Sequence, residues 1–200
     1  MERGNLKRGI SLLEVMLAAT LFLLLLGVVL RILFPLFGYF RWTSARAELL
    51  QAAALSARYL AGDLQRAPME GVVLPRLNSS ELLSIHGVED VTDTGRAVWS
   101  ADLIIYSSNL SLGTLTRILA PGNVAQPLKL PPDDLKAFLL DSNLPRRTLV
   151  RGLLREFELK LSGTRSLPLR LRMVMSLEVP GRPPQTYEHV QNIQLRNGGS

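Results

Sequence analysis

The chain has 200 residues, no cysteine, and a net charge of +6 that arises from 23 basic and 17 acidic residues. This length allows one membrane segment and one modest domain, because domains typically run about 100–150 residues. The lack of cysteine excludes disulfides, thiolate metal sites and cysteine nucleophiles, so an extracytoplasmic domain would have to be stable through its core alone.

The first feature along the chain is a short basic leader, residues 1–9, followed by an apolar run. Sixteen residues from Val15 to Leu30 carry no charge, and Glu14 is the one charge between Ile10 and Leu30. At 1.5 Å per residue, a helix over the whole run spans about 30 Å, the hydrocarbon thickness of a bilayer. The basic leader predicts a cytoplasmic N-terminus, with the following domain on the other side of the membrane. A cleaved secretory signal is disfavoured, because the run leads into Arg31 without a small-residue cleavage site.

Glu14 is the anomaly in this run. An ionisable group inside lipid costs about 2.5–3.5 kcal/mol even on lenient insertion scales, so a plain anchor would not carry one. A cut after Gly9 would create a new amine at Ile10, and the amine of one subunit could pair with Glu14 of its neighbour. The alternative, that Glu14 lies at the headgroup level and is merely solvated, remains open at this point.

The residues Gly-Ile-Ser-Leu-Leu-Glu-Val at Gly9–Val15 follow three basic residues and precede a single apolar helix. This pattern resembles the class III signal of type IV prepilins and pseudopilins. The resemblance implies that a membrane prepilin peptidase cuts after Gly9, that Ile10 becomes the methylated N-terminus, and that Glu14 pairs with the amine of the next subunit during assembly. Two departures are Ile10, where the family usually has phenylalanine, and Arg31, near the place where major pilins often carry a proline.

Beyond the apolar run, residues 31–42 resemble a membrane interface, with Arg31 positioned to snorkel and aromatic residues from Phe34 to Trp42 forming a belt. Pro35 and Gly38 mark a possible kink. Residues 41–67 then show a helical period that Pro68 ends. The apolar positions of that period are Leu49, Ala53, Ala57, Leu60 and Leu64, with Arg46, Arg58, Asp63 and Arg66 elsewhere around the helix.

After Pro68 the period changes from 3.6 to 2, which indicates strands. The expected strands are Leu82–Ile85, Asp102–Tyr106, Leu115–Leu119, Glu156–Leu161, Leu169–Val179 and Tyr187–Leu195. The proline-rich residues 120–134 predict a loop, and Asp133-Asp134 predict a short helix after it. In Leu169–Val179 one face is apolar, including Leu171, Met173, Met175 and Leu177, which predicts burial beneath Leu60 and Leu64 of the long helix.

No motif for nucleotide binding, zinc binding or nucleophilic catalysis occurs. His86 and His189 are isolated and favour surface or strand positions over roles as ligand or base. Glu89, Asp90 and Asp93 could hold Ca²⁺, although solvation of a loop is the favoured interpretation. The charge is uneven: residues 68–145 carry 5 basic and 9 acidic residues, and residues 146–200 carry 10 and 4. This distribution favours a polarised surface that meets other subunits over a nucleic-acid footprint.

These patterns predict an α+β fold. Residues 10–67 would form a long N-terminal helix, transmembrane over 10–34, and residues 68–200 a β-rich extracytoplasmic domain with an antiparallel sheet packed on the outer half of that helix. No cofactor, metal ion or enzymatic activity is expected.

The resemblance implies a minor structural subunit of a type IV pilus, a type II secretion pseudopilus or a competence-type filament, most like the J-type or W-type minor subunits. Such a subunit is stored in the inner membrane and placed at the filament tip, where it starts assembly. Its partners would be other pilin or pseudopilin subunits, the prepilin peptidase and the inner membrane, with no nucleic acid. One alternative is an uncleaved single-pass protein with a periplasmic sensor, binding or enzymatic domain. Another is a DNA-binding tip subunit that uses the basic stretch Arg146–Arg172.

Overall fold

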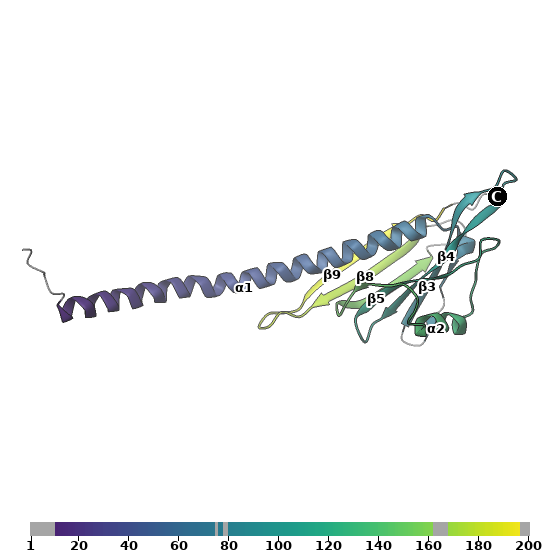
Figure 1. The fold of residues 1–200 in the computed structure, drawn as a ribbon. Coiled ribbons are helices and arrows are strands. Elements are labelled where there is room, and N and C mark those ends of the chain that lie inside the picture. The colour runs from purple at the N-terminus through teal and green to yellow at the C-terminus, as the bar shows by residue number, and fades with distance from the viewer. Residues whose placement is uncertain (1–10, 75, 78–79, 162–167, 197–200) are drawn as a thin grey trace, which may run out of the picture. The chain divides into compact units, whose positions relative to one another are not determined.

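The computed structural model describes residues 11–74, 76–77, 80–161 and 168–196. It has the expected α+β fold: a long apolar N-terminal helix, and antiparallel sheets that pack on its outer half (Figure 1). By compactness the chain divides into two units, with the boundary between Ser44 and Ala45.

The helix α1 runs unbroken from Leu12 to Gln65 and passes through Pro35. Proline has no N–H to donate to the carbonyl four residues earlier, which is that of Arg31. The helix ends where expected. The amide of Ala67 donates to the Leu64 carbonyl, and a short 3₁₀ turn, η1 (Met69–Gly71), follows Pro68.

The described residues of the second unit form nine strands in two antiparallel sheets. The six-stranded sheet has the order β1-β3-β4-β5-β6, with β2 also paired to β3; the three-stranded sheet has the order β7-β8-β9. The strands are β1 (Val72–Val73), β2 (Arg76–Leu77), β3 (Ser80–Val91), β4 (Ala97–Asn109), β5 (Thr114–Pro121), β6 (Arg146–Val150), β7 (Leu154–Leu161), β8 (Leu169–Leu177) and β9 (Gln185–Ile193).

The predicted strands all lie on or overlap observed ones, whereas β1, β2 and β6 were not predicted. The short helix also forms, as α2 (Pro132–Leu140), but Asp133 and Asp134 do not cap it: Pro131 is the N-cap residue, and the two aspartates lie in the first turn. Pro132 begins the helix, where a proline is favourable because its missing N–H would have no helical partner. The loop predicted over residues 120–134 is shorter in the structure, because β5 ends at Pro121 and α2 begins at Pro132.

The main hydrophobic core lies between the outer part of α1 and one face of both sheets. The predicted apolar positions of the helix are all buried, and so are Leu171, Met173 and Met175 of β8, whereas Leu177 is half-buried. The predicted packing of β8 on the helix is therefore confirmed, and Leu60 and Leu64 belong to the same core.

A smaller core covers the opposite face of the six-stranded sheet. Leu103, Ile105 and Ile118 lie there against Leu135 of α2, with further contacts from the segment that leads into the helix. The six-stranded sheet is thus a middle layer, with α1 on one face and α2 on the other (Figure 1).

The two sheets meet at a glycine pair. Gly113 has a φ of +63°, and a Cβ at this position would lie 2.8 Å from the carbonyl carbon of Gly152. The carbonyl of Gly113 accepts the amide of Leu154 at 3.0 Å, which joins the β4–β5 turn to the first residue of β7. A larger residue at position 113 would therefore separate the sheets.

Candidate functional site: the uncovered helix and the polar contacts of the domain

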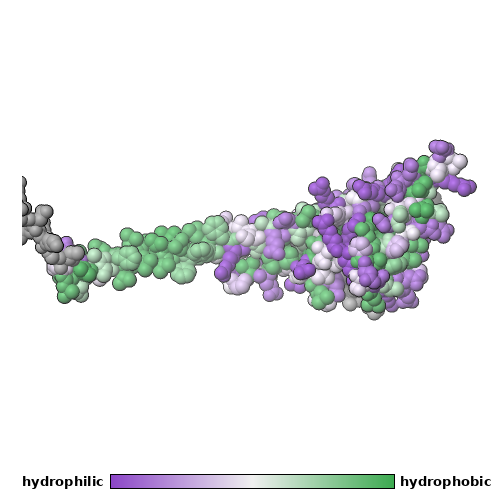
Figure 2. Space-filling model, in the orientation of Figure 1, coloured by the Kyte–Doolittle hydropathy of each residue, from purple (hydrophilic) through white to green (hydrophobic). Residues whose placement is uncertain are grey.

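The first half of α1 has no cover. Every residue described from Ser11 to Leu36 is exposed, and the most apolar stretch of the helix has no buried residue. Figure 2 shows the result as a continuous hydrophobic surface along this part of the chain. In the part of the chain that is described, α1 is the one helix long and apolar enough to cross a membrane. An apolar surface of this size requires lipid or other protein around it.

Glu14 lies in the first turn of this helix and is exposed. Its amide donates to the Ser11 carbonyl at 3.0 Å, and the amide of Val15 approaches the same carbonyl at 3.2 Å. A carboxylate in the first turn of a helix interacts favourably with the helix dipole, worth about 0.3–1 kcal/mol at an exposed site. That gain is smaller than the insertion cost of a charge in lipid, so the helix terminus alone does not account for Glu14 if this turn enters the bilayer.

The expected processing site, Gly9 and Ile10, lies outside the described residues. The predicted role of Glu14 therefore rests on its place in the sequence and on its exposed position at the start of an uncovered apolar helix.

At the other end of the apolar run, Arg31 and the expected aromatic belt are exposed along α1, apart from Trp42, which is half-buried. The rings of Tyr39 and Trp42 lie 6.4 Å apart, centre to centre. Exposed aromatic residues at one end of an apolar helix are typical of a membrane–water interface.

In the second unit, a buried carboxylate joins α1 to the six-stranded sheet. Asp63 accepts the Tyr106 hydroxyl at 2.6 Å and Nε of Arg117 at 2.7 Å on Oδ2, and Nη2 of Arg117 at 3.2 Å on Oδ1. The side chains of Asp63 and Arg117 are only 11% and 19% exposed. The expectation that Asp63 lies away from the packed face of the helix is wrong: it is buried within that face.

The charges of this cluster support one another. Burial, followed by the negative charge of Asp63, raises the pKa of the Tyr106 hydroxyl well above its usual range. Burial alone would lower the pKa of Arg117, but the hydrogen bond and charge of Asp63 outweigh it and raise that pKa. Tyr106 therefore stays neutral and Arg117 charged, the forms that donate to a carboxylate. This arrangement fixes α1 on the sheet and has no free nucleophile or base.

His86 lies on β3 and is fully buried, which rules out the surface position that was one of its two expected environments. The amide of Leu128 donates to Nδ1 at 2.9 Å, so Nε2 must carry the proton, which it donates to the Ser100 carbonyl at 2.8 Å. The ring also packs on Trp99, with centres 5.2 Å apart. Both nitrogens are used, so His86 holds the segment after β5 against the sheet and is unavailable as a ligand or base. His189, on β9, is half-buried and lies near Gln191.

Four of the basic residues in the stretch Arg146–Arg172 make contacts within the domain, namely Arg146, Arg147, Lys160 and Arg172. Arg146 donates to the carbonyls of Phe138, Leu139 and Asp141, which closes the C-terminal end of α2. The guanidinium of Arg147 lies 4.7 Å from the centre of the Tyr59 ring.

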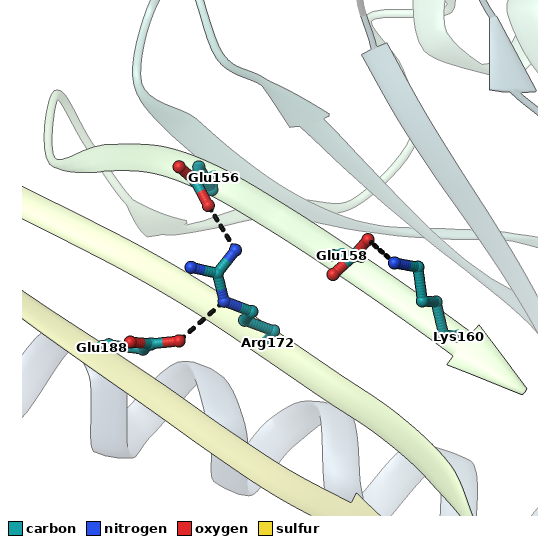
Figure 3. A network of polar contacts seen from close by, with 5 residues as sticks. All are labelled: Glu156, Glu158, Lys160, Arg172 and Glu188. Carbon is teal, nitrogen blue, oxygen red and sulfur yellow. Dashed lines mark hydrogen bonds and ion pairs between the residues drawn. The ribbon is translucent and has the colours of Figure 1, made fainter. Parts of the chain in front are cut away.

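The remaining engaged cations of this stretch lie on the exposed face of the three-stranded sheet. Arg172 bridges Glu156 at 2.5 Å and Glu188 at 2.6 Å, and Lys160 pairs with Glu158 (Figure 3). The hydrogen bond from Lys160 lowers the pKa of Glu158, and the hydrogen bond that Arg172 donates to Glu188 raises the pKa of Arg172. Charges paired in this way are less available to phosphates.

The acidic residues Glu89, Asp90 and Asp93 are exposed and are not gathered into one group. No group of three or more potential ligand side chains occurs among the described residues, and a carboxylate oxygen of Asp90 accepts the neighbouring amide of Val91 at 2.8 Å. Comparisons of the chain with protein-family models, with curated proteins and with solved structures found no match.

Proposed function

We propose that this protein is a minor subunit of a type IV pilin-like filament, of a pilus, type II secretion or competence type, processed after Gly9 and assembled through its N-terminal helix. The observation that carries the proposal is the division of α1. Its first half is apolar and uncovered, whereas its second half is packed tightly on the β domain.

This division suits a subunit that changes surroundings. In the membrane, lipid covers the apolar half of α1; in a filament, the same half lies against equivalent helices of other subunits. Glu14, at the start of that half, then pairs with the Ile10 amine of a neighbour. The domain supplies no catalytic chemistry in this proposal, and its role is to stand outside the helical core of the filament. Within that superfamily, the size of the chain, its β-rich second half and its lack of cysteine are most like those of J-type or W-type minor subunits.

The first test is the intact mass of the protein extracted from membranes of cells that contain an active prepilin peptidase. Loss of residues 1–9, with a methylated Ile10, is the expected result. A full-length mass would contradict the proposal and favour the alternative, an uncleaved single-pass protein with a periplasmic sensor, binding or enzymatic domain.

The second test uses Glu14→Gln, with Glu48→Gln as the matched control. Both residues are exposed carboxylates on α1, but Glu48 lies in the packed second unit. Glu14→Gln removes the charge that would pair with a neighbouring amine in an apolar environment, so we expect normal insertion and cleavage with a several-fold loss from sheared filaments. Glu48→Gln should incorporate normally. Equal incorporation of both variants, in cells without the wild-type subunit, would remove Glu14 as the assembly contact.

A further inference from the structure

The strands at the borders of the two sheets differ in how well their edges are protected. β1 and β2 have two residues each, and β6 has five, two of which are arginines engaged elsewhere. β7 carries alternating charges and a register shift between Leu154 and Glu156. Short length, charge and bulges are the usual means by which proteins prevent an edge strand from pairing further.

β9 has less of this protection. It pairs with β8 over nine consecutive residues without a register shift, and it contains no proline, lysine or arginine. Its one charged residue, Glu188, forms an ion pair with Arg172 on the neighbouring strand β8 (Figure 3). Among the described residues, no strand pairs with the other edge of β9. Val190, in the middle of the strand, is 45% exposed.

We propose that the outer edge of β9 binds an extended strand of a different polypeptide, which extends the three-stranded sheet by main-chain hydrogen bonds. The backbone edge supplies the affinity, and the side chains on the exposed face of the sheet select the sequence.

The selection follows from the rows of side chains across β7, β8 and β9. One row is Lys160, Arg170 and Asn192. Lys160 pairs with Glu158, whereas Arg170 forms no ion pair among the described residues. An added strand therefore gains most from a carboxylate beside Asn192, within reach of Arg170.

The next two rows complete the pattern. Val190 continues the row of Arg172, whose charge two glutamates already satisfy, so an apolar residue fits beside it. Glu188 ends the row of Val174, and a lysine or arginine fits there. The bound strand thus presents an acidic, an apolar and a basic residue at alternating positions.

A second copy of this chain is a poorer occupant. The backbone bridge between Pro68 and Arg196 is parallel, so the chain after β9 runs in the same direction as the chain after α1. If β9 paired antiparallel with β9 of another copy, the C-terminal ends of α1 in the two copies would run in opposite directions. This exclusion rests on the proposed anchoring of both copies in one membrane; the rest of the inference does not.

The test uses the full-length protein in detergent micelles and fluorescein-labelled nine-residue peptides, with binding followed by anisotropy. The first peptide is Thr-Tyr-Glu-Thr-Val-Thr-Lys-Tyr-Thr, in which glutamate, valine and lysine share one face. The second has lysine in place of the glutamate, and the third is the first peptide with alternate backbone amides methylated. We expect saturable binding of the first peptide, about two- to fivefold weaker binding of the second, and no binding of the third.

Two variants locate the site. Arg170→Glu should reverse the preference between the first two peptides, and Val190→Lys should weaken both while leaving the melting temperature unchanged. Failure of the first peptide to bind, equal binding of the first two, or indifference to backbone methylation would overturn the proposal. So would disulfide-linked dimers of a Val190→Cys variant under mild oxidation, which would identify a second copy as the occupant. Peptide binding does not require cleavage after Gly9, so this result is independent of the test of the proposed function.

Discussion

Replacing Asp63 by asparagine tests whether its carboxylate holds α1 on the sheet. The side chain keeps its size but loses its charge, and Arg117, whose side chain is only 19% exposed, loses its ion pair. Removing one partner of a buried pair costs about 3–5 kcal/mol. Because both side chains retain some exposure, we expect the lower end, about 3 kcal/mol in the free energy of unfolding. For a unit of this size, that loss lowers the melting temperature by about 6–12 °C.

The assay is urea and thermal unfolding of the full-length protein in detergent, followed by near-ultraviolet circular dichroism. Asp102→Asn is the control, since Asp102 is an exposed carboxylate on β4, and we expect a change within about 0.5 kcal/mol. The double variant Asp63→Leu/Arg117→Met should be less destabilised than Asp63→Leu alone, because it leaves no buried charge unpaired. An Asp63→Asn protein as stable as Asp102→Asn would refute the reasoning.

Three further predictions follow from the domain. Met173→Asp places a charge at a fully buried site, so we expect loss of the cooperative melting transition. The control Thr186→Asp, on the exposed face of β9, should melt normally. An unchanged melt for Met173→Asp would show that the β8 register is wrong. The pKa of Tyr106 is raised in the folded state, so its contribution to the free energy of unfolding is complete below the unfolded value of 10.0 and is lost as the pH rises above it. The stability of Tyr106→Phe should therefore fall less steeply than that of the wild type between pH 10 and 11. Equal slopes would exclude this linkage. Because several cations of Arg146–Arg172 are already paired, the full-length protein should show no submicromolar, salt-sensitive binding to duplex DNA in a filter or anisotropy assay, and such binding would revive the DNA-binding alternative.

Much of the architecture follows from local patterns in the sequence. The 3.6-residue period from Leu49 to Leu64 and the two-residue period of β8 identified the two surfaces that meet in the core, because each period places its apolar residues on one face. The apolar run after Glu14 likewise identified the part of α1 that the domain does not cover. By contrast, β6 was missed because two arginines begin it, and their stabilising contacts lie with α2 and with Tyr59.

The tertiary structure alone decided the roles of Asp63 and His86. A lone aspartate in a helical pattern is assigned to the exposed face, because charged residues are seldom buried without a partner. The partners of Asp63 lie 43 and 54 residues away, and those of His86 lie 14 and 42 residues away, so no local pattern contains them. The outer edge of β9, which pairs with no strand among the described residues, is of the same kind. Alternation identified the strand, but only the strand order shows which of its edges pairs with β8, since that depends on where the other strands of the sheet lie.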